Sequence, residues 1–262
     1  MQDERIIGRA DGPVGHVIFN NPAKLNAVSL DMWEAVHGLL TKYAEDPAIR
    51  VVVASGAGGK AFMSGADISK FESERANMEA QQRYDAISSR SYDLMYNFPK
   101  PTLAKVFGYC IGGGMNFAGC CDLRFCNEGA RFGVPAAKLG LGYGYERVRR
   151  LAESIGLPKT LEVIYTGRQF SAQEALDMGF VQRVVPDAEL DATVAETAAA
   201  IAQNAPLTIA LAKASAREVG KPEGKQDLAR LDAMTKACFD SQDYTEGRRA
   251  FMEKRKPNFQ GK

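Results

Sequence analysis

The 262-residue sequence has almost no excess charge and no long apolar run. Its 33 Lys and Arg residues balance 32 Asp and Glu residues, which leaves a net charge of +1. Such a chain lacks the excess of basic side chains with which proteins bind nucleic-acid phosphates. No apolar stretch reaches the roughly 20 residues that span a membrane, and the N-terminus lacks the features of a signal peptide. We therefore expect a cytoplasmic protein that binds a small molecule and neither nucleic acid nor membrane.

Cysteine pairs and histidine clusters, the usual marks of disulfide scaffolds and metal centres, are also missing. The five cysteines are odd in number and form no CxxC pair, which is typical of reduced, mostly buried thiols. The only histidines are His16 in a predicted strand and His37 in a predicted helix. Neither lies near the glycine-rich segments described below, so we expect no catalytic histidine and no metal site.

Short β-rich runs alternate with helical patterns along most of the chain. Strands are expected at 14–20, 50–55, 102–107 and 122–126, and helices from Ser29 to just before Pro47 and at about 75–96. Ser171 followed by Glu174 predicts a short helix that begins with a capping box. This alternation predicts an α/β architecture. Strand signals stop near residue 190, so we divide the chain into a core at 1–190 and a helical C-terminal region at 191–262.

Two glycine-containing segments each follow a predicted strand. AFMSGADI occupies 61–68 and GYCIGGGMN occupies 108–116. Glycine lets the backbone approach a ligand closely, and a helix N-terminus adds the positive end of its dipole. Backbone N–H groups exposed in these segments could stabilise a developing oxyanion. Each segment alone is explained more simply by a tight turn or by close packing.

Taken together and in order, five motifs resemble those of the crotonase, or enoyl-CoA hydratase/isomerase, superfamily. They are NPAKLNAVS at 21–29, AFMSGADI at 61–68, GYCIGGGMNFAGCCDLRF at 108–125, FGVPAAKLGLG at 132–142 and TGRQFSAQEALDMGFVQRVV at 166–185. The resemblance implies an α/β fold of the crotonase type, a spiral of ββα units with a helical C-terminal region that mediates trimerisation. It also implies assembly as a homotrimer or a dimer of trimers.

The resemblance implies where an acyl-CoA substrate would bind. It assigns an oxyanion hole to the backbone N–H groups of Ala66 and Gly113, which would polarise the thioester carbonyl and stabilise its enolate. The residues placed where the family packs coenzyme A are Lys24, Leu25, Ala27, Asp67 and Ile68. Coenzyme A thus enters as part of the substrate, and no separate cofactor is expected.

The sequence departs from the hydratase pattern at two positions. Hydratases of this superfamily carry one glutamate shortly after the triple glycine and another after FGxP, because hydration needs a general base and a general acid. Here these positions are Asn116 and Ala136, and neither side chain can transfer a proton at neutral pH. Ordinary hydration is therefore not expected, although Asn116 could hydrogen-bond a water or a substrate carboxylate.

The segment LGLGYGYE at 139–146 is expected to supply polar groups to the same pocket. Tyr143 matches a tyrosine that orients the departing carboxylate in the methylmalonyl-CoA decarboxylases of the superfamily, although those enzymes carry a histidine where this chain has Ala66. Aromatic packing over the acyl group is an equally good explanation of Tyr143. Glu146 would serve isomerisation if it faced the α- or γ-carbon, whereas an ion pair with a nearby arginine is its simpler explanation.

We therefore expect an enzyme that acts on an acyl-CoA thioester through an enolate. Decarboxylation positioned by Tyr143 is the leading reaction, because loss of CO2 generates the enolate without a carboxylate base. The alternatives are isomerisation with Glu146, hydration by atypical residues, a non-catalytic acyl-CoA-binding protein, and a scaffold that uses only its trimeric surface.

Overall fold

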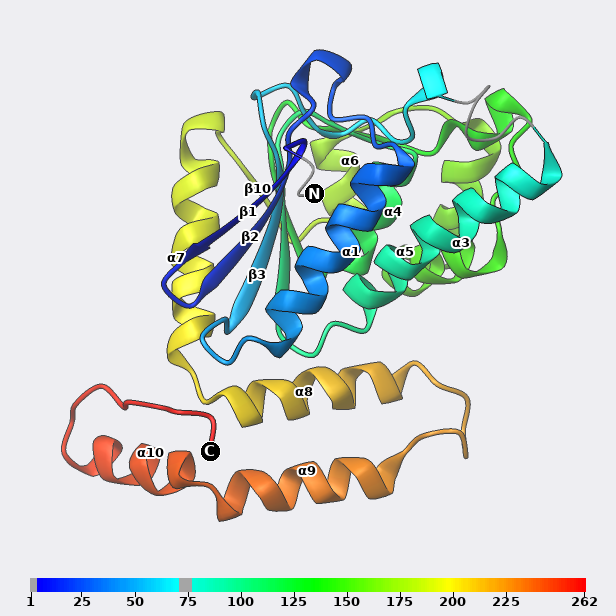
Figure 1. The fold of residues 1–262 in the computed structure, drawn as a ribbon. Helices are drawn as coiled ribbons and strands as arrows, with labels where there is room; N and C mark the ends of the chain where they lie inside the picture. Colours follow the sequence, from blue (N-terminus) through cyan, green and yellow to red (C-terminus); the bar gives the residue numbers. More distant parts are fainter. Residues whose placement is uncertain (1–3, 71–76) are drawn as a thin grey trace.

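A six-stranded sheet forms the centre of the fold in the computed structural model, which describes residues 4–70 and 77–262 (Figure 1). Its strands, in spatial order, are β1 (Ile6–Asp11), β2 (Val14–Phe19), β3 (Val51–Gly56), β5 (Thr102–Val106), β7 (Leu123–Asn127) and β10 (Arg183–Val185). The hairpin of β1 and β2 is antiparallel, and the later neighbours pair in parallel. All four predicted strands are confirmed, with each end within about one residue of its predicted position.

A second, smaller sheet carries the segments that follow these strands. Its strands, in spatial order, are β4 (Ala61–Met63), β6 (Tyr109–Ile111), β8 (Arg131–Gly133) and β9 (Phe170–Ser171). Strands β4, β6 and β8 pair in parallel, and each is the next strand in the chain after β3, β5 or β7. This repetition places the ends of β4 and β6 side by side. The two glycine-containing segments therefore lie next to each other.

Helices cover both faces of the large sheet. In chain order they are α1 (Leu30–Glu45), α3 (Met78–Tyr96), α4 (Gly113–Cys120), α5 (Tyr145–Thr166), α6 (Ala172–Asp177), α7 (Leu190–Gln203), α8 (Pro206–Val219), α9 (Leu228–Asp240) and α10 (Gln242–Met252), with short 3₁₀ turns at 22–24, 68–70, 135–139 and 187–189. The first residues of the helix predicted at 75–96 lie outside the described residues. Among the helices described, none is both long and apolar enough to cross a membrane.

The C-terminal part is helical, as predicted, but its first helix belongs to the layered core. On α7, Val194 and Ala198 pack against Val51, Val53 and other residues on one face of the large sheet. Helices α8, α9 and α10 lie beyond the end of the sheet (Figure 1). The domain boundary near residue 190 stays a prediction.

Of the two helix starts predicted from a serine, one shows the expected capping hydrogen bonds and the other does not. The predicted capping box of α6 is confirmed: the Glu174 N–H donates to Ser171 Oγ at 3.2 Å, and the Ser171 N–H donates to the Glu174 carboxylate at 2.8 Å. Helix α1 begins directly after Ser29, as predicted, yet the Ser29 hydroxyl makes no capping hydrogen bond. All five cysteines are free thiols, and Cys110, for example, is buried.

Helix α4 is held in place by an aromatic cluster. The ring of Phe117 is fully buried, and its centroid lies 5.3 Å from that of Phe19, 5.8 Å from Trp33 and 6.1 Å from Tyr92. These partners come from β2, α1 and α3. Because α4 begins at Gly113, this cluster also fixes the position of the glycine-rich turn.

We predict that Phe117→Ala lowers the free energy of unfolding by about 3–5 kcal/mol, since it removes a buried ring and leaves a cavity. The control is Tyr165→Ala, which truncates a side chain that is 72% exposed and should change stability by about 0.5 kcal/mol or less. Urea denaturation measures both. Similar losses for the two variants would contradict the assigned role of the cluster.

Candidate active site

A cavity of about 400 Å³ opens where the ends of β4 and β6 meet the start of α4. Its walls come from residues within 64–68, 111–116 and 134–143, together with side chains from α3 and α5. This volume is in the range of small-molecule sites, which are about 300–1,000 Å³. Of the four residues with predicted catalytic roles, Ala66, Gly113 and Tyr143 line this cavity.

The two glycine-containing segments approach each other so closely that a Cβ on either Gly65 or Gly113 would be in contact with the other segment. A Cβ placed on Gly113 would lie 3.6 Å from the Cα of Gly65 and only 2.9 Å from the hydroxyl oxygen of Tyr92. Gly65 has a φ of +105°, which favours glycine, and a Cβ placed on it would lie 3.5 Å from the Gly113 nitrogen. The turn next to Ala66 and the start of α4 are thus brought together by two glycines.

Among the described residues, the backbone N–H groups of Ala66 and Gly113 make no secondary-structure hydrogen bond. Val28 donates to the carbonyl of Gly65 at 2.9 Å and accepts from the N–H of Asp67 at 3.0 Å. In such a parallel bridge the N–H of the middle residue, Ala66, points away from Val28. Gly113 is the first residue of α4, and the first N–H groups of a helix have no acceptor within it. Two N–H donors are therefore available from adjacent segments, as an oxyanion hole requires.

Asn116 and Ala136 both line the cavity, and neither provides a proton-transferring group. The Asn116 side chain is 6% exposed, and its amide nitrogen has no hydrogen-bond partner among the described residues. A buried donor without a partner is costly, so a ligand atom that accepts its hydrogen bond would be favoured there. Across the part of the chain that the structure describes, no three metal-ligating side chains come together.

Tyr143 and Tyr92 face an arginine inside the cavity. The guanidinium carbon of Arg147 lies 5.9 Å from the ring centroid of Tyr143 and 6.0 Å from that of Tyr92. Burial raises the pKa of both tyrosine hydroxyls well above the usual value. Both hydroxyls are therefore protonated at neutral pH and can donate hydrogen bonds.

Sequence reasoning missed Tyr92, Asp85 and Arg147, which all line the cavity. Arg147 donates from Nη2 to Oδ1 of Asp85 at 3.1 Å, a bond that joins α5 to α3. Asp85 is the single carboxylate among the described residues of the cavity wall. The available signal for Arg147 was its place directly after the segment 139–146, but no motif marked it or its partner on α3.

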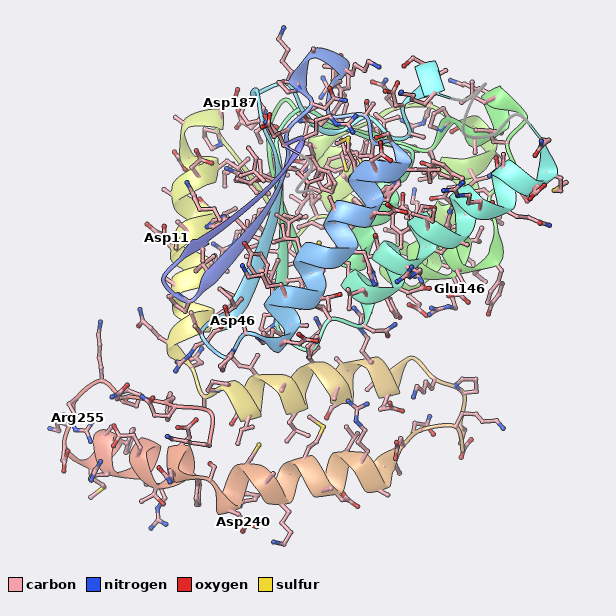
Figure 2. The ribbon with its side chains drawn as sticks, viewed as in Figure 1. Asp11, Asp46, Glu146, Asp187, Asp240 and Arg255 are labelled. Carbon is pink, nitrogen blue, oxygen red and sulfur yellow. The ribbon has the colours of Figure 1, made fainter. Side chains whose placement is uncertain are left out.

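The structure corrects the expectation that Glu146 projects into the cavity. This residue, labelled in Figure 2, lies in the first turn of α5. It does not line the cavity, and its side chain is 56% exposed. It accepts hydrogen bonds from Nε and Nη2 of Arg149 at 3.1 and 2.7 Å. These bonds hold the pKa of Glu146 below its usual range. The simpler explanation, an ion pair with a nearby arginine, is confirmed.

The residues predicted to pack coenzyme A come from two adjacent segments: Lys24, Leu25 and Ala27 from one, Asp67 and Ile68 from the other. Nζ of Lys24 donates to the Asp67 carboxylate at 2.7 Å. Burial opposes the charge of Asp67, but hydrogen bonds from Lys24 and Ser69 outweigh this effect and hold the pKa of Asp67 below its usual range. Only Ile68 of the five lines the cavity, and its side chain is largely exposed. Their role in binding coenzyme A stays a prediction.

Gly114 explains why the triple glycine extends into α4. A Cβ on Gly114 would lie 2.1 Å from the carbonyl oxygen of Met63 in β4, so the helix packs directly on the strand backbone. We predict that Gly114→Ala destabilises the fold by an amount near the upper end of the about 1–3 kcal/mol typical of overpacking.

The matched control for Gly114→Ala is Gly38→Ala. Gly38 is an exposed glycine within α1, with no atom within 4 Å of the added Cβ, so its replacement should stabilise the fold by about 0.5–1 kcal/mol. Chemical denaturation of the two variants should thus give shifts of opposite sign. A neutral or stabilising Gly114→Ala would contradict the close approach of α4 to β4.

Comparison with known proteins agrees with the fold. The sequence model of the family described as "Enoyl-CoA hydratase/isomerase" matches residues 9–262. A crotonyl-CoA hydratase of Syntrophomonas wolfei is 32% identical over 259 residues, 99% of each chain. A peroxisomal Delta(3,5)-Delta(2,4)-dienoyl-CoA isomerase of Arabidopsis thaliana is 33% identical over 270 aligned positions, 98% of this chain and 96% of the relative.

Solved structures show the same likeness in three dimensions. The crystal structure of an enoyl-CoA hydratase/carnithine racemase from Magnetospirillum magneticum has a TM-score of 0.93 and 35% identity, and the match covers 99% of this chain and 97% of that one. The enoyl-CoA hydratase of Bacillus anthracis has a TM-score of 0.89 and 32% identity, and the match covers 99% of this chain and 100% of that one. The predicted crotonase fold is confirmed, and the chain belongs to the enoyl-CoA hydratase/isomerase family of the crotonase superfamily.

Proposed function

We propose that the cavity binds the thioester of an acyl-CoA, with its carbonyl oxygen between the N–H groups of Ala66 and Gly113. Two donors aimed at one oxygen polarise the carbonyl and stabilise the negative charge of an enolate. The juxtaposition of these two N–H groups, at adjacent glycine turns in a cavity of suitable size, is the observation that carries the proposal. The names of the family and of its relatives support the choice of an acyl-CoA substrate.

The proposed reaction is decarboxylation of an acyl-CoA that carries a carboxylate on its α-carbon, as malonyl-CoA does. Asn116 and Ala136 provide no acid or base, Glu146 lies outside the cavity, and Asp85 is engaged by Arg147. A site so poor in free carboxylates suits a reaction that creates the enolate without removing a proton from carbon. Protonated Tyr143 then serves to orient the substrate carboxylate.

The electron balance of this step is simple. The bond between the α-carbon and the carboxylate carbon breaks, and CO2 leaves. The electron pair of that bond passes into the thioester to form the enolate. The enolate oxygen accepts hydrogen bonds from the N–H groups of Ala66 and Gly113. The α-carbon then takes one proton from a water or from the Tyr143 hydroxyl, and a deprotonated tyrosine regains its proton from solvent.

Hydration or isomerisation of an enoyl-CoA is the second candidate. It is favoured by the names of the relatives, which include a crotonyl-CoA hydratase and a dienoyl-CoA isomerase. In this chain the reaction would have to use an atypical base, and Asp85 is the carboxylate that the described part of the wall offers. We further propose that Lys24 and its neighbours contact coenzyme A and that the protein assembles as a homotrimer or a dimer of trimers.

The reaction is tested by incubating the purified protein in D2O with malonyl-CoA, methylmalonyl-CoA and crotonyl-CoA, followed by mass spectrometry. We expect loss of CO2 from a malonyl-type thioester with one deuterium at the α-carbon. Addition of water to crotonyl-CoA, or deuterium exchange without loss of mass, would support the second candidate and contradict decarboxylation. Binding without turnover of any of the three would contradict both reactions and favour a non-catalytic acyl-CoA-binding protein.

Two tyrosine variants test the role of Tyr143 in that assay. We predict that Tyr143→Phe lowers kcat by about 10²-fold, because the hydroxyl that can give the α-carbon its proton is lost. Tyr145→Phe removes the hydroxyl of a neighbouring side chain that is 76% exposed, and should leave kcat unchanged. Equal activity of the two variants would show that Tyr143 contributes only aromatic packing.

A further inference from the structure

Arg147 gives the acyl end of the cavity a positive charge that enolate chemistry at the thioester does not require. We propose that Arg147, together with the Asn116 amide and the Tyr143 hydroxyl, binds a carboxylate carried by the acyl group. The substrates are then acyl-CoA thioesters with a second, anionic end. This proposal rests on the proposed thioester site, because that site places the acyl group in the same cavity.

The guanidinium is poised to receive a ligand. Arg147 is half-buried and lies against the faces of two tyrosine rings, which hold its position without using its N–H donors. Within the described residues, the hydrogen bond shown for this group is the one to Asp85. An arginine carries five N–H donors in a fixed fork that matches a carboxylate, so donors remain for a bound anion.

Two other polar groups of the cavity wall, the Asn116 amide nitrogen and the Tyr143 hydroxyl, are donors as well. The buried amide nitrogen of Asn116 has no partner in the described structure, and burial keeps the Tyr143 hydroxyl protonated. A neutral acyl chain packed here would strip water from these groups and return no hydrogen bond. A carboxylate would accept from all of them. The cavity therefore discriminates against acyl groups that end in a methyl.

Asp85 limits how strongly the anion is held. Its carboxylate is partly exposed and shares Arg147 with any ligand, so it reduces the local positive charge. This matters for decarboxylation, because a contact with the departing carboxylate is made in the ground state and lost as CO2 forms. Removing Arg147 should therefore raise KM for a malonyl-type substrate while kcat is unchanged or higher.

Binding of a matched pair of ligands tests the proposal independently of turnover. Succinyl-CoA and butyryl-CoA have acyl groups with the same number of carbon atoms. The succinyl group ends in a carboxylate, and the butyryl group ends in a methyl. By isothermal titration calorimetry we expect the intact protein to prefer succinyl-CoA. Arg147→Met should weaken succinyl-CoA binding by about 10–100-fold and leave butyryl-CoA binding unchanged, as expected for loss of a charge-assisted hydrogen bond.

Three further variants guard against a purely structural effect. Arg149→Met removes the next arginine on α5, which pairs with Glu146 outside the cavity, and should alter neither affinity. Arg147→Lys should restore part of the succinyl-CoA affinity, because it keeps the charge without the fork. Asp85→Asn removes the competing anion and should tighten succinyl-CoA binding, a gain that a damaged fold would not produce.

The outcomes separate this inference from the proposed function. Equal weakening of both thioesters in Arg147→Met, or weaker succinyl-CoA binding in Asp85→Asn, would overturn the carboxylate site. Failure of the intact protein to bind either thioester would overturn the thioester site and this inference with it. Selective loss of succinyl-CoA affinity in a protein that releases no CO2 would uphold the carboxylate site and refute decarboxylation alone.

Discussion

Two backbone segments come into contact at Gly65 and Gly113, and the cavity depends on this contact. The paired repeats of the two sheets bring β4 and β6 together, and Gly114 lets α4 pack on the carbonyl of Met63. The contact places the N–H of Ala66 near the start of α4. Because both donors belong to the backbone of packed elements, their geometry is set before a ligand arrives, which is the condition for effective charge stabilisation.

Different parts of the fold supply the backbone groups and the charged side chains of the cavity wall. The turns of the small sheet and the start of α4 supply the backbone N–H groups that we propose bind the thioester, while α3 and α5 provide the charged side chains Asp85 and Arg147. Every residue type except proline has a backbone N–H, so most substitutions at these positions would keep the donors. Side chains on helices can be exchanged without disturbing the proposed oxyanion hole, and in our proposal this part of the wall sets which acyl groups fit.

Sequence alone predicted the four central strands, the capped helix at Ser171 and the two glycine segments, because each depends on local periodicity or on a residue type that the backbone conformation demands. It failed at α5. Successive residues of a helix are turned by about 100°, so Arg147 faces the cavity while Glu146 faces an arginine outside it. The partner of Arg147, Asp85, lies on α3, and only tertiary packing shows that the two meet.

The central claim is that the N–H groups of Ala66 and Gly113 polarise a bound thioester carbonyl. Isotope-edited infrared spectroscopy of butyryl-CoA, labelled with ¹³C at the carbonyl carbon, measures this directly and needs no turnover. The account predicts that the carbonyl stretch of the bound ligand moves to lower frequency than that of the free thioester. A bound ligand whose stretch stays at the frequency seen in water would contradict it.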